Sequence, residues 1–465
     1  MNRYSALFFF LWALIFSCTP PADKITTSSA AKLSFSQDSI LFDTIFSAIG
    51  STTQLITIYN PNKNAVRTDI KLGGGTASNY SLIINGTPSY NTDLEIDGKD
   101  SILILITVLI NPRDTSLPYL VHDSIVFTTN GNVQSVQLEA YGQDANPIRG
   151  PIPCNKVWND PKPYVLYNTV TVAAGCTLTI SKGTKVYAHN NALLKVYGTL
   201  LVNGVKSSPV IFRGDRLEES YASVPGQWTG ILFEAGSTAN LNWAVIENAV
   251  DGIEIRSGAP KTDTIPDFVI ANSVIKNMSD EALKAIGANV YAYNSLFTNC
   301  ANYVISADGG GNYYFYYCTI AGYSPSLFRM NPSLQISATT VTSDSSTQTG
   351  QINARLINTI VWGDGTYSNE LALTPGSDFS LFADYSLIYD SSAANLNGIG
   401  NKTYGAADTL DPKFNAPYNF DFHLESGSSA LGAGIPLSVN GVAITTDLDS
   451  VVRSTTKPSI GAYEK

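Results

Sequence analysis

Short runs of alternating apolar and polar residues fill the segment from residue 32 to residue 145. The runs end at clusters of Asn, Gly and Pro, which are the residues that turns require. The strongest turn signal is Asn130-Gly131, which separates the alternating runs 123–129 and 133–140 and predicts a two-residue β-hairpin. About seven strands in a segment of this length predict an immunoglobulin-like β-sandwich over residues 32–145.

The pattern changes at residue 151. Short alternating runs continue, but single bends such as those at Gly175 and Gly183 separate them, in place of paired hairpin turns. Single bends are expected where a chain winds as a coil of three short faces. The sequence therefore predicts a β-solenoid over residues 151–465, and residues 151–168 and 430–465 are expected to cover its two ends.

A tetrad of Asn, Ser or Thr, any residue and an apolar residue recurs in this solenoid. It begins at Asn272, Asn294 and Asn358, and Cys318-Thr319 is placed in the same frame. Successive tetrads begin 22, 24 and 40 residues apart, which fits one coil per unit with an insertion before the last. Because equivalent residues of stacked strands lie roughly 4.8 Å apart, the three Asn are expected to form a structural ladder, with Cys318 as a small buried residue in their column.

The pattern of short strands and single bends in the second segment resembles that of the right-handed parallel β-helix family. The residues that carry the resemblance are 174–180, 182–187, 198–200, 227–231, 411–414, 421–424, 447–449 and 460–464. The sequence departs from the family at Ser450, where the family often has Gly. The resemblance implies a right-handed parallel β-helix over residues 151–465, and proteins of this fold often bind or act on polysaccharides.

The beginning of the chain predicts export. Arg3 precedes the apolar run 7–16, which is shorter than the roughly 20 residues that a membrane-spanning helix needs. The four residues that end at Cys18 resemble the lipobox of bacterial lipoproteins, which implies that residues 1–17 are a signal peptide and that Cys18 carries the lipid. Residues 18–31, which are rich in Pro, Thr, Ser and Ala, are expected to be a flexible tether.

Three motifs of the first segment, at residues 42–44, 130–132 and 140–142, resemble the N-terminal sandwich modules of Bacteroidetes envelope lipoproteins. We therefore expect an outer-membrane lipoprotein of the cell envelope that meets the membrane through its lipid anchor only. Whether it faces the periplasm or the cell surface is left open. The net charge of −10 argues against nucleic acid as a partner, because a negative surface repels polyanions.

Cysteine and histidine residues limit the chemistry further. Cys154 and Cys176 flank the start of the solenoid, and in an oxidising envelope compartment they are candidates for a disulfide. His122, His189 and His423 are the only histidines, and they are too scattered for a His-built metal site. We expect no cofactor, with a structural or catalytic calcium ion left open.

Acidic residues recur at the spacing of a coil. Asp251, Asp280 and Asp308 are 29 and 28 residues apart, which predicts that they lie in one column of the solenoid. Together with Glu281 and Lys284 they are candidates for catalysis by a polysaccharide lyase, or in second place by a glycoside hydrolase with paired carboxylates about 5 Å apart. The alternative is that Asp before Gly only forms turns at the coil corners.

Aromatic residues gather at the same level of the solenoid. If the ladder Asn residues point inward, Tyr291, Tyr293, Phe315 and Tyr317 form an exposed platform, because successive side chains of a strand face opposite ways. Flat rings with polar tips are suited to stacking against sugars, which makes these residues the candidate glycan-binding set. The alternative is that Tyr is favoured in β-strands and has no ligand.

The sequence therefore favours a lipid-anchored, non-catalytic protein that presents a solenoid face to a polysaccharide or to an envelope or surface protein. One alternative is a carbohydrate-active enzyme that uses a groove of the solenoid, and another is an architectural element or adhesin. An enzyme should bring carboxylates together with a Lys or Arg, whereas a binding protein should expose aromatic side chains without them.

Overall fold

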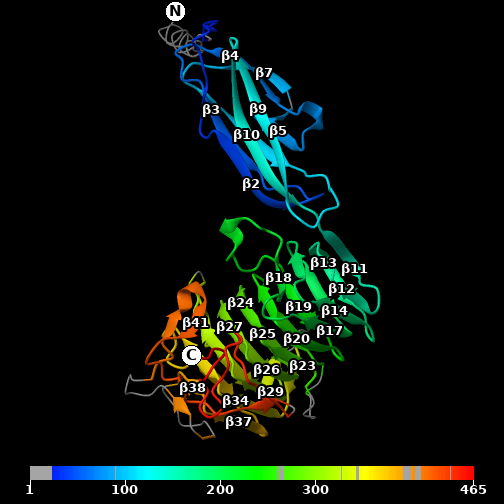
Figure 1. Ribbon diagram of the computed structural model, residues 1–465, viewed down its shortest axis with the longest axis vertical. Coiled ribbons are helices and arrows are strands. Elements are labelled where there is room, and N and C mark those ends of the chain that lie inside the picture. The colour runs from blue at the N-terminus through cyan, green and yellow to red at the C-terminus, as the bar shows by residue number, and fades with distance from the viewer. Residues whose placement is uncertain are drawn as a thin grey trace, which may run out of the picture. The chain divides into compact units, whose positions relative to one another are not determined.

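The chain folds into β-strands and divides into two compact units, Met1–Asp144 and Ala145–Lys465 (Figure 1). The computed structural model describes residues 23–89, 91–258, 260, 266–325, 327–341, 345–390, 398–399, 401–403, 410–439 and 441–465. Within these residues the helices are the short 3-10 turns η1 (Gly75–Ala77), η2 (Glu219–Tyr221) and η3 (Pro417–Asn419). The predicted signal peptide and the predicted lipidation site Cys18 lie outside the described residues.

The first unit consists of two five-stranded sheets. One sheet has the order β1 (Ser34–Phe35), β3 (Gln54–Tyr59), β8 (Ser101–Val108), β5 (Tyr80–Ile84) and β6 (Thr87–Pro88). The other has the order β2 (Ser39–Phe46), β10 (Asn132–Gln143), β9 (Tyr119–Thr129), β4 (Val66–Leu72) and β7 (Asn91–Ile96). Among these strands only β2 and β10 pair in parallel, and the other pairings are antiparallel.

One hydrophobic core joins the two sheets of the first unit. Inward residues of both sheets, such as Ile104 of β8 and Phe127 of β9, are fully buried in it. The hairpin predicted at Asn130-Gly131 is confirmed, since β9 and β10 pair through this turn and both residues have positive φ, 49° and 83°. A two-residue hairpin turn favours Asn-Gly because it needs this left-handed conformation.

Residues 23–31 pack against the first unit, so the prediction of a free tether over 18–31 is wrong for this part. The side chain of Asn130 donates to the carbonyl oxygens of Thr26 (2.9 Å) and Ser28 (3.1 Å). Asn132 donates in the same way to two carbonyl oxygens of the segment. The composition of the segment gave no signal of this, because the stabilising groups are its backbone carbonyls and the hairpin amides.

The second unit is a parallel β-solenoid. A coil such as β25 (Leu283–Ile286), β26 (Asn289–Tyr293) and β27 (Leu296–Cys300) supplies one strand to each of three faces, and every strand pairs in parallel with its equivalents in the next coils. Faces 1 and 3, together with β11 (Asn146–Pro151), β13 (Tyr164–Val172) and β39 (Lys402–Thr403), form an 18-stranded sheet, and face 2 is a nine-stranded sheet. Alternate residues of all three faces point inward and form one continuous hydrophobic core.

Each face is defined by its strands. Face 1 comprises β16 (Leu193–Val196), β19 (Gly230–Phe233), β22 (Ile253–Arg256), β25, β28 (Ile305–Asp308), β31 (Leu334–Ser337) and β36 (Leu371–Thr374). Face 2 comprises β12 (Lys156–Trp158), β14 (Thr177–Ser181), β17 (Thr199–Asn203), β20 (Thr238–Asn242), β23 (Phe268–Ala271), β26, β29 (Gly311–Tyr316), β34 (Ile352–Ile357) and β37 (Phe379–Asp384). Face 3 comprises β15 (Lys185–Ala188), β18 (Val210–Gly214), β21 (Ala244–Glu247), β24 (Val274–Met278), β27, β30 (Thr319–Gly322), β35 (Ile360–Gly363) and β38 (Leu387–Ile388).

The remaining strands begin the solenoid, end it or decorate it. They are β11 (Asn146–Pro151), β13 (Tyr164–Val172), the hairpin β32 (Thr339–Val341) and β33 (Thr347–Thr349), β39 (Lys402–Thr403), and the C-terminal strands β40 (Phe414–Ala416), β41 (Asp421–Leu424), β42 (Ser438–Val439) and β43 (Val442–Ala443). β13 pairs with both β15 and β16, and therefore links face 3 to face 1 in the first coil.

The C-terminal segment packs along face 3, where it lies beside β24 and β27 in Figure 1. Its residues Phe422, Leu448 and Ile460 form a hydrophobic cluster with Leu296 and Ile360, which point outward from face 3. The prediction that residues 430–465 cover an end of the solenoid is therefore wrong. Outward apolar residues on a solenoid face need cover as much as an open end does, and here the segment supplies it.

Asn side chains stack at the turn between faces 2 and 3. Nδ2 of Asn272 donates to Oδ1 of Asn242 (2.8 Å), and Nδ2 of Asn294 donates to Oδ1 of Asn272 (3.2 Å). Asn272, Asn294 and Asn358 have φ of 49°, 49° and 52°, the left-handed region that Asn tolerates. Asn358 does not extend the ladder, because both ends of its amide bond the backbone of Ile435 in the C-terminal segment.

Tyr317 interrupts the ladder. The register of β27 and β30 places Tyr317 beside Asn294 and Cys318 beside Ser295, and Tyr317 has the same left-handed φ of 52°. The prediction that Cys318 occupies the Asn position is therefore wrong by one residue. Cys318 lies instead in a buried column of hydroxyl residues, where its N–H donates to Oγ1 of Thr359 (3.4 Å).

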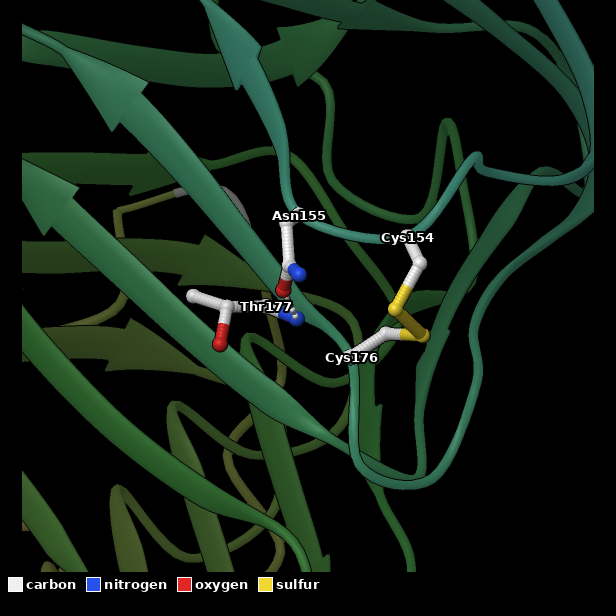
Figure 2. Close-up of a disulfide and its surroundings, with 4 residues drawn as sticks. All are labelled: Cys154, Asn155, Cys176 and Thr177. Atoms are coloured by element: carbon white, nitrogen blue, oxygen red, sulfur yellow. Dashed lines mark hydrogen bonds between the residues drawn. A yellow bond between two sulfur atoms is a disulfide. The ribbon is translucent and has the colours of Figure 1, made fainter.

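Cys154 and Cys176, the pair nominated from the sequence, form a disulfide at the start of the solenoid (Figure 2). The bond joins Cys154, two residues before β12, to Cys176, the residue before β14. Beside it, Oδ1 of Asn155 accepts a hydrogen bond from the N–H of Thr177 (3.2 Å). The first coils are therefore linked covalently as well as by their strand pairing.

Candidate functional site

Four tyrosine side chains lie on the outer side of face 2. The residues that alternate with Tyr291 and Tyr293 on β26 are buried in the core, so these two tyrosines point outward. The register of β26 and β29 aligns Tyr291 with Tyr314 and Tyr293 with Tyr316. We call these four residues the tyrosine face.

Three of the rings pack against one another. The centroids of Tyr291 and Tyr316 are 5.1 Å apart with the rings nearly perpendicular, and those of Tyr291 and Tyr314 are 5.4 Å apart. Burial raises the pKa of Tyr291, Tyr293 and Tyr314, and the neighbouring Tyr316 adds to the rise at Tyr291. The phenol groups therefore stay protonated and can act as hydrogen-bond donors at any physiological pH.

The next two coils extend this surface with a cation and another ring. Arg355 of β34 is aligned with Tyr314, and Phe382 of β37 is aligned with Arg355, so the three side chains follow one another in one outward column. Arg355 and Phe382 are exposed, and the guanidinium carbon of Arg355 is 5.8 Å from the ring centroid of Phe382. The outward surface thus spans four coils, with Arg355 and Phe382 exposed, Tyr291, Tyr293 and Tyr314 partly exposed, and Tyr316 buried.

A row of amides borders the tyrosine face. Nδ2 of Asn312 donates to Oδ1 of Asn289 (2.7 Å), and Nδ2 of Asn353 donates to Oδ1 of Asn312 (3.1 Å). Asn353 also donates to the hydroxyl oxygen of Tyr314 (2.8 Å), which fixes that ring and leaves its O–H proton free to point elsewhere. The surface therefore combines flat rings with amide and hydroxyl groups.

Two of the four residues that the sequence nominated as the platform are buried. Phe315 is 0% exposed in the solenoid core, and Tyr317 is also buried, with its hydroxyl donating to the carbonyl oxygen of Ile435 (2.7 Å). The prediction is wrong for both because it carried the one-residue error at Cys318 into β29, and a slip of one residue reverses the direction of every side chain in a strand. Placing Tyr317 beside Asn294 would have nominated Tyr314 and Tyr316.

Arg355 and Phe382 were also missed by the sequence prediction. The run 352–357 alternates apolar and polar residues, which is a local signal that Asn353 and Arg355 point outward. The insertion before this strand prevented its alignment with β29, so the signal could not be connected to the tyrosines.

Carboxylates and a lysine gather on face 1, at the level of the tyrosine face. Lys284 points outward from β25, and the register aligns it with Glu254 of β22 and with Ser306 of β28. Asp251 and Glu281 precede their strands at one side of Lys284, and Asp308 ends β28 at the other side. We call these residues, with Asp280, the Lys284 cluster.

Burial shifts the pKa values of several residues of the Lys284 cluster. Burial, followed by the charge of Asp280, raises the pKa of Asp251 to about 6. Burial also raises the pKa of Glu281 to about 8 and that of Asp308 to about 6. For Lys284, burial lowers the pKa, but Asp251 and the other carboxylates outweigh burial and hold the pKa above its ordinary value. At neutral pH the cluster therefore holds a protonated Glu281 beside a charged lysine.

Hydrogen bonds within the solenoid already occupy two of these carboxylates. Glu281, which is 4% exposed, accepts from Oγ of Ser306 and from Nδ2 of Asn302 (3.0 Å). Asp308, which is 8% exposed, accepts at both oxygens from Nε2 of Gln335 (3.0 Å each). These carboxylates stabilise the stacking of the coils and offer little surface to a ligand.

The predicted column of Asp251, Asp280 and Asp308 does not form. The residue beside Asp251 in the next coil is Glu281, whose N–H donates to Oδ1 of Asp251 (3.2 Å), and Asp280 comes one residue earlier. Asp308 is aligned with Ile286 at the far end of the strands. The spacings of 29 and 28 residues were misleading because the coils that begin at β22 and β25 differ in length.

Two observations concern metals and membranes. Within the part of the chain that the structure describes, no group of three or more His, Cys, Asp or Glu side chains is arranged to hold a metal ion. In the same residues, no helix has the length and apolar character that crossing a bilayer requires.

No family model matches this chain, and no curated protein matches it. Similar solved structures include the ASH / PapD-like domain of human CEP192, at 13% identity over 28% of this chain and 99% of that chain, with a TM-score of 0.19. The catalytic unit of a GH87 alpha-1,3-glucanase from Streptomyces thermodiastaticus is 10% identical over 76% of this chain and 89% of that chain, with a TM-score of 0.23. A family 123 glycoside hydrolase from Clostridium perfringens is 11% identical over 27% of this chain and 30% of that chain, with a TM-score of 0.19. Scores this low do not establish a shared fold or activity.

Proposed function

We propose that this chain is a cell-envelope protein that binds glycans through the tyrosine face and has no catalytic role. The observation that carries the proposal is the outward alignment of Tyr291 and Tyr293 with Tyr314 and Tyr316 on adjacent coils. Tyrosine rings offer apolar faces for stacking on the C–H surfaces of sugars, and their hydroxyls offer hydrogen bonds. Adjacent coils lie roughly 4.8 Å apart, so the rings form one aromatic surface across the two coils, in which they are tilted to one another by 46° to 84°.

The setting of the tyrosine face supports the same proposal. Asn289, Asn312 and Asn353 line its border with stacked amide groups. Asn289 and Asn312 are buried, so the partly exposed Asn353 is the one of the three that can meet a sugar hydroxyl. The exposed ring of Phe382 continues the apolar surface two coils further. A surface with rings in its middle and amides at its edge is suited to a polyhydroxylated ligand.

The finer features of the chain belong to the same proposal. We infer that the first unit is an immunoglobulin-like spacer, supported by its two sheets around one core, and that the solenoid is a right-handed parallel β-helix. We infer further that the chain is an outer-membrane lipoprotein of the Bacteroidetes type, anchored through Cys18. The lipobox resemblance at residues 15–18 supports this anchor, and radiolabelled palmitate incorporation with a Cys18→Ser control tests it.

The proposal is tested by glycan-array binding of residues 23–465, which keep every described contact. The variant carries Tyr291→Ala and Tyr314→Ala. A matched control carries Tyr187→Ala and Tyr197→Ala, which removes two solvent-accessible tyrosines that lie outside the tyrosine face. Binding that the first variant loses and the control keeps supports the proposal, whereas absence of binding to any glycan favours a protein partner.

A second candidate function is polysaccharide cleavage at the Lys284 cluster. Asp251, Glu281 and Asp308 have raised pKa values near one lysine, which is an arrangement that acid–base chemistry on a sugar chain could use. We place this function second because Glu281 and Asp308 are almost fully buried and hydrogen-bonded. Release of soluble products from bound glycans, lost in Lys284→Met and kept in Tyr291→Ala, would move cleavage to first place.

A further inference from the structure

We propose that the tyrosine face selects glycans that carry acidic groups, and that Arg355 is the residue that selects them. This inference rests on the proposed glycan binding and adds the chemical class of the ligand. Arg355 lies in the same outward column as Tyr291 and Tyr314, one coil beyond Tyr314, and the next residue in that column is Phe382. A sugar ring stacked on these tyrosines therefore lies within reach of the guanidinium.

Charge is scarce on face 2. The eight strands from β14 to β37, all of which the structure describes, contain two charged residues, Arg355 and Asp384. Asp384 lies in the neighbouring column, aligned with Ile357, and its Oδ1 accepts a hydrogen bond from the N–H of Ile399 (2.8 Å). From β14 to β37, Arg355 is therefore the one cation on a surface of rings, amides and hydroxyls. The other cation of face 2, Lys156, lies on β12 at the start of the solenoid, seven strands of the sheet away from β34.

Several cations on the other faces of the solenoid have carboxylate partners. Lys195 on face 1 contacts Glu234 (2.8 Å), and Lys276 on face 3 contacts Glu247 (3.4 Å). Among the described residues no carboxylate lies within ion-pair distance of Arg355, which is exposed. The solenoid thus pairs several of its cations between adjacent residues or coils but leaves this one available.

The chemistry of arginine points to an oxyanion as the partner. A guanidinium stays charged at all physiological pH values and presents paired N–H donors that match a carboxylate or sulfate group. A neutral glycan can use the N–H groups of an exposed arginine only as hydrogen-bond donors, whereas an oxyanion gains the charge attraction as well. The uronate or sulfate group of an acidic polysaccharide would form a charge-assisted pair with Arg355 while its ring stacks on Tyr314.

The net charge of −10 opposes long-range attraction of a polyanion. At physiological ionic strength the screening length is about 8 Å, so charges elsewhere on the chain act weakly on a sugar bound at face 2. A contact pair is screened less, and an exposed ion pair is worth at most about five-fold in affinity. We therefore expect a modest preference for acidic glycans that is set at the contact itself.

The test compares matched ligands that share a sugar backbone and differ in whether the acidic group is present and charged. The pairs are oligogalacturonate with its methyl ester, oligomannuronate with its methyl ester, and dextran sulfate with dextran. Binding constants are measured for residues 23–465 and for Arg355→Gln, Tyr291→Ala/Tyr314→Ala and Arg67→Gln. Arg67→Gln removes an exposed arginine of the first unit and controls for the change in net charge.

We expect the unaltered protein to bind the acidic member of at least one pair more tightly than the neutral member, by up to about five-fold. Arg355→Gln should abolish the preference and keep the neutral binding, Arg67→Gln should change neither, and the tyrosine variant should weaken both. Equal affinity for the two members of every bound pair, or a preference that survives Arg355→Gln, would overturn the role of Arg355 but leave the glycan-binding proposal standing. No binding to any member would overturn the glycan-binding proposal, and this inference with it.

Discussion

The guanidinium carbon of Arg453 lies 3.9 Å from the centroid of the Tyr317 ring. Nη2 of Arg453 donates to Oδ1 of Asn294 (2.9 Å) and to the carbonyl oxygens of Gly461 (3.0 Å) and Ala462 (3.2 Å). One buried side chain of the C-terminal segment thus contacts the Asn ladder, the residue that interrupts it, and the last turn of the chain. The segment is held to face 3 at this point by a cation and not by apolar contacts alone.

Replacing Arg453 with Met should lower the free energy of unfolding of the second unit by about 2–4 kcal/mol. The variant leaves Oδ1 of Asn294 and two buried carbonyl oxygens without this donor, and buried acceptors that lose a charged donor are costly. Urea denaturation of residues 23–465 measures the change. The control Arg67→Met, at an exposed position in the first unit, should change the free energy of unfolding by less than about 0.5 kcal/mol. An equally small effect of Arg453→Met would contradict the stabilising role given to Arg453.

The stability of the solenoid should fall as pH rises from about 4.5 to about 8, in part because of Glu281. Burial raises the pKa of this carboxyl to about 8 in the folded state, so the folded chain holds a proton that the unfolded chain releases above about pH 4.5. The contribution is complete below the unfolded pKa and is lost as pH rises through the folded pKa. Glu281→Gln is neutral throughout, so its melting temperature should fall less than that of the unaltered protein.

Thermal melts at pH 5, 7 and 9 measure this difference, at roughly 2–4 °C per kcal/mol for a unit of this size. Glu425→Gln, at an exposed position in the same unit, is the matched control and should follow the unaltered protein. A constant offset between Glu281→Gln and the unaltered protein at all three pH values would show that Glu281 does not take up a proton on folding.

Local signals were sufficient to predict an all-β chain with a parallel β-solenoid. Asn130-Gly131 predicts a hairpin by itself. The tetrads at Asn272, Asn294 and Asn358 predict a coil, because each tetrad occupies one turn and depends on few distant residues. The path of the C-terminal segment could not be predicted in this way. Its contacts join Tyr317 to Ile435, residues 118 apart in sequence, and no local pattern specifies such a pairing.

The candidate site was predicted in place but not in detail. Tyr291 and Tyr293 were identified because they occupy alternate positions of β26 directly before Asn294 of the ladder. The next coil was misread because Tyr317 occupies a left-handed position where Asn is the usual residue, so the tetrad was aligned on Cys318. Trp243 and Tyr385 take the same conformation in other coils, with φ of 52° and 49°, which shows that this solenoid admits aromatic residues at the turn.

Phe315 and Tyr314 should respond in opposite ways to substitution by Ala. Phe315 is fully buried, so its loss should cost about 3–5 kcal/mol of unfolding free energy through the cavity it leaves. Tyr314 is partly exposed, so its replacement by Ala should cost about 1 kcal/mol or less of unfolding free energy and should weaken glycan binding. Urea denaturation and binding measured on the same two variants test the register of β29, and a larger stability loss at Tyr314 would mean that the register is reversed.

Removing the disulfide should destabilise the start of the solenoid. Cys154 and Cys176 are 22 residues apart, and closing a loop of this size removes unfolded-state entropy worth roughly 3 kcal/mol. The double variant Cys154→Ser/Cys176→Ser should therefore unfold at lower urea concentration than the unaltered chain. Dithiothreitol should lower the stability of residues 23–465 to that of the variant and should leave the variant unchanged, because Cys300 and Cys318 are buried thiols without a disulfide to lose. Equal urea midpoints for the oxidised chain and the variant would mean that the parallel strand pairing alone holds the first coils together.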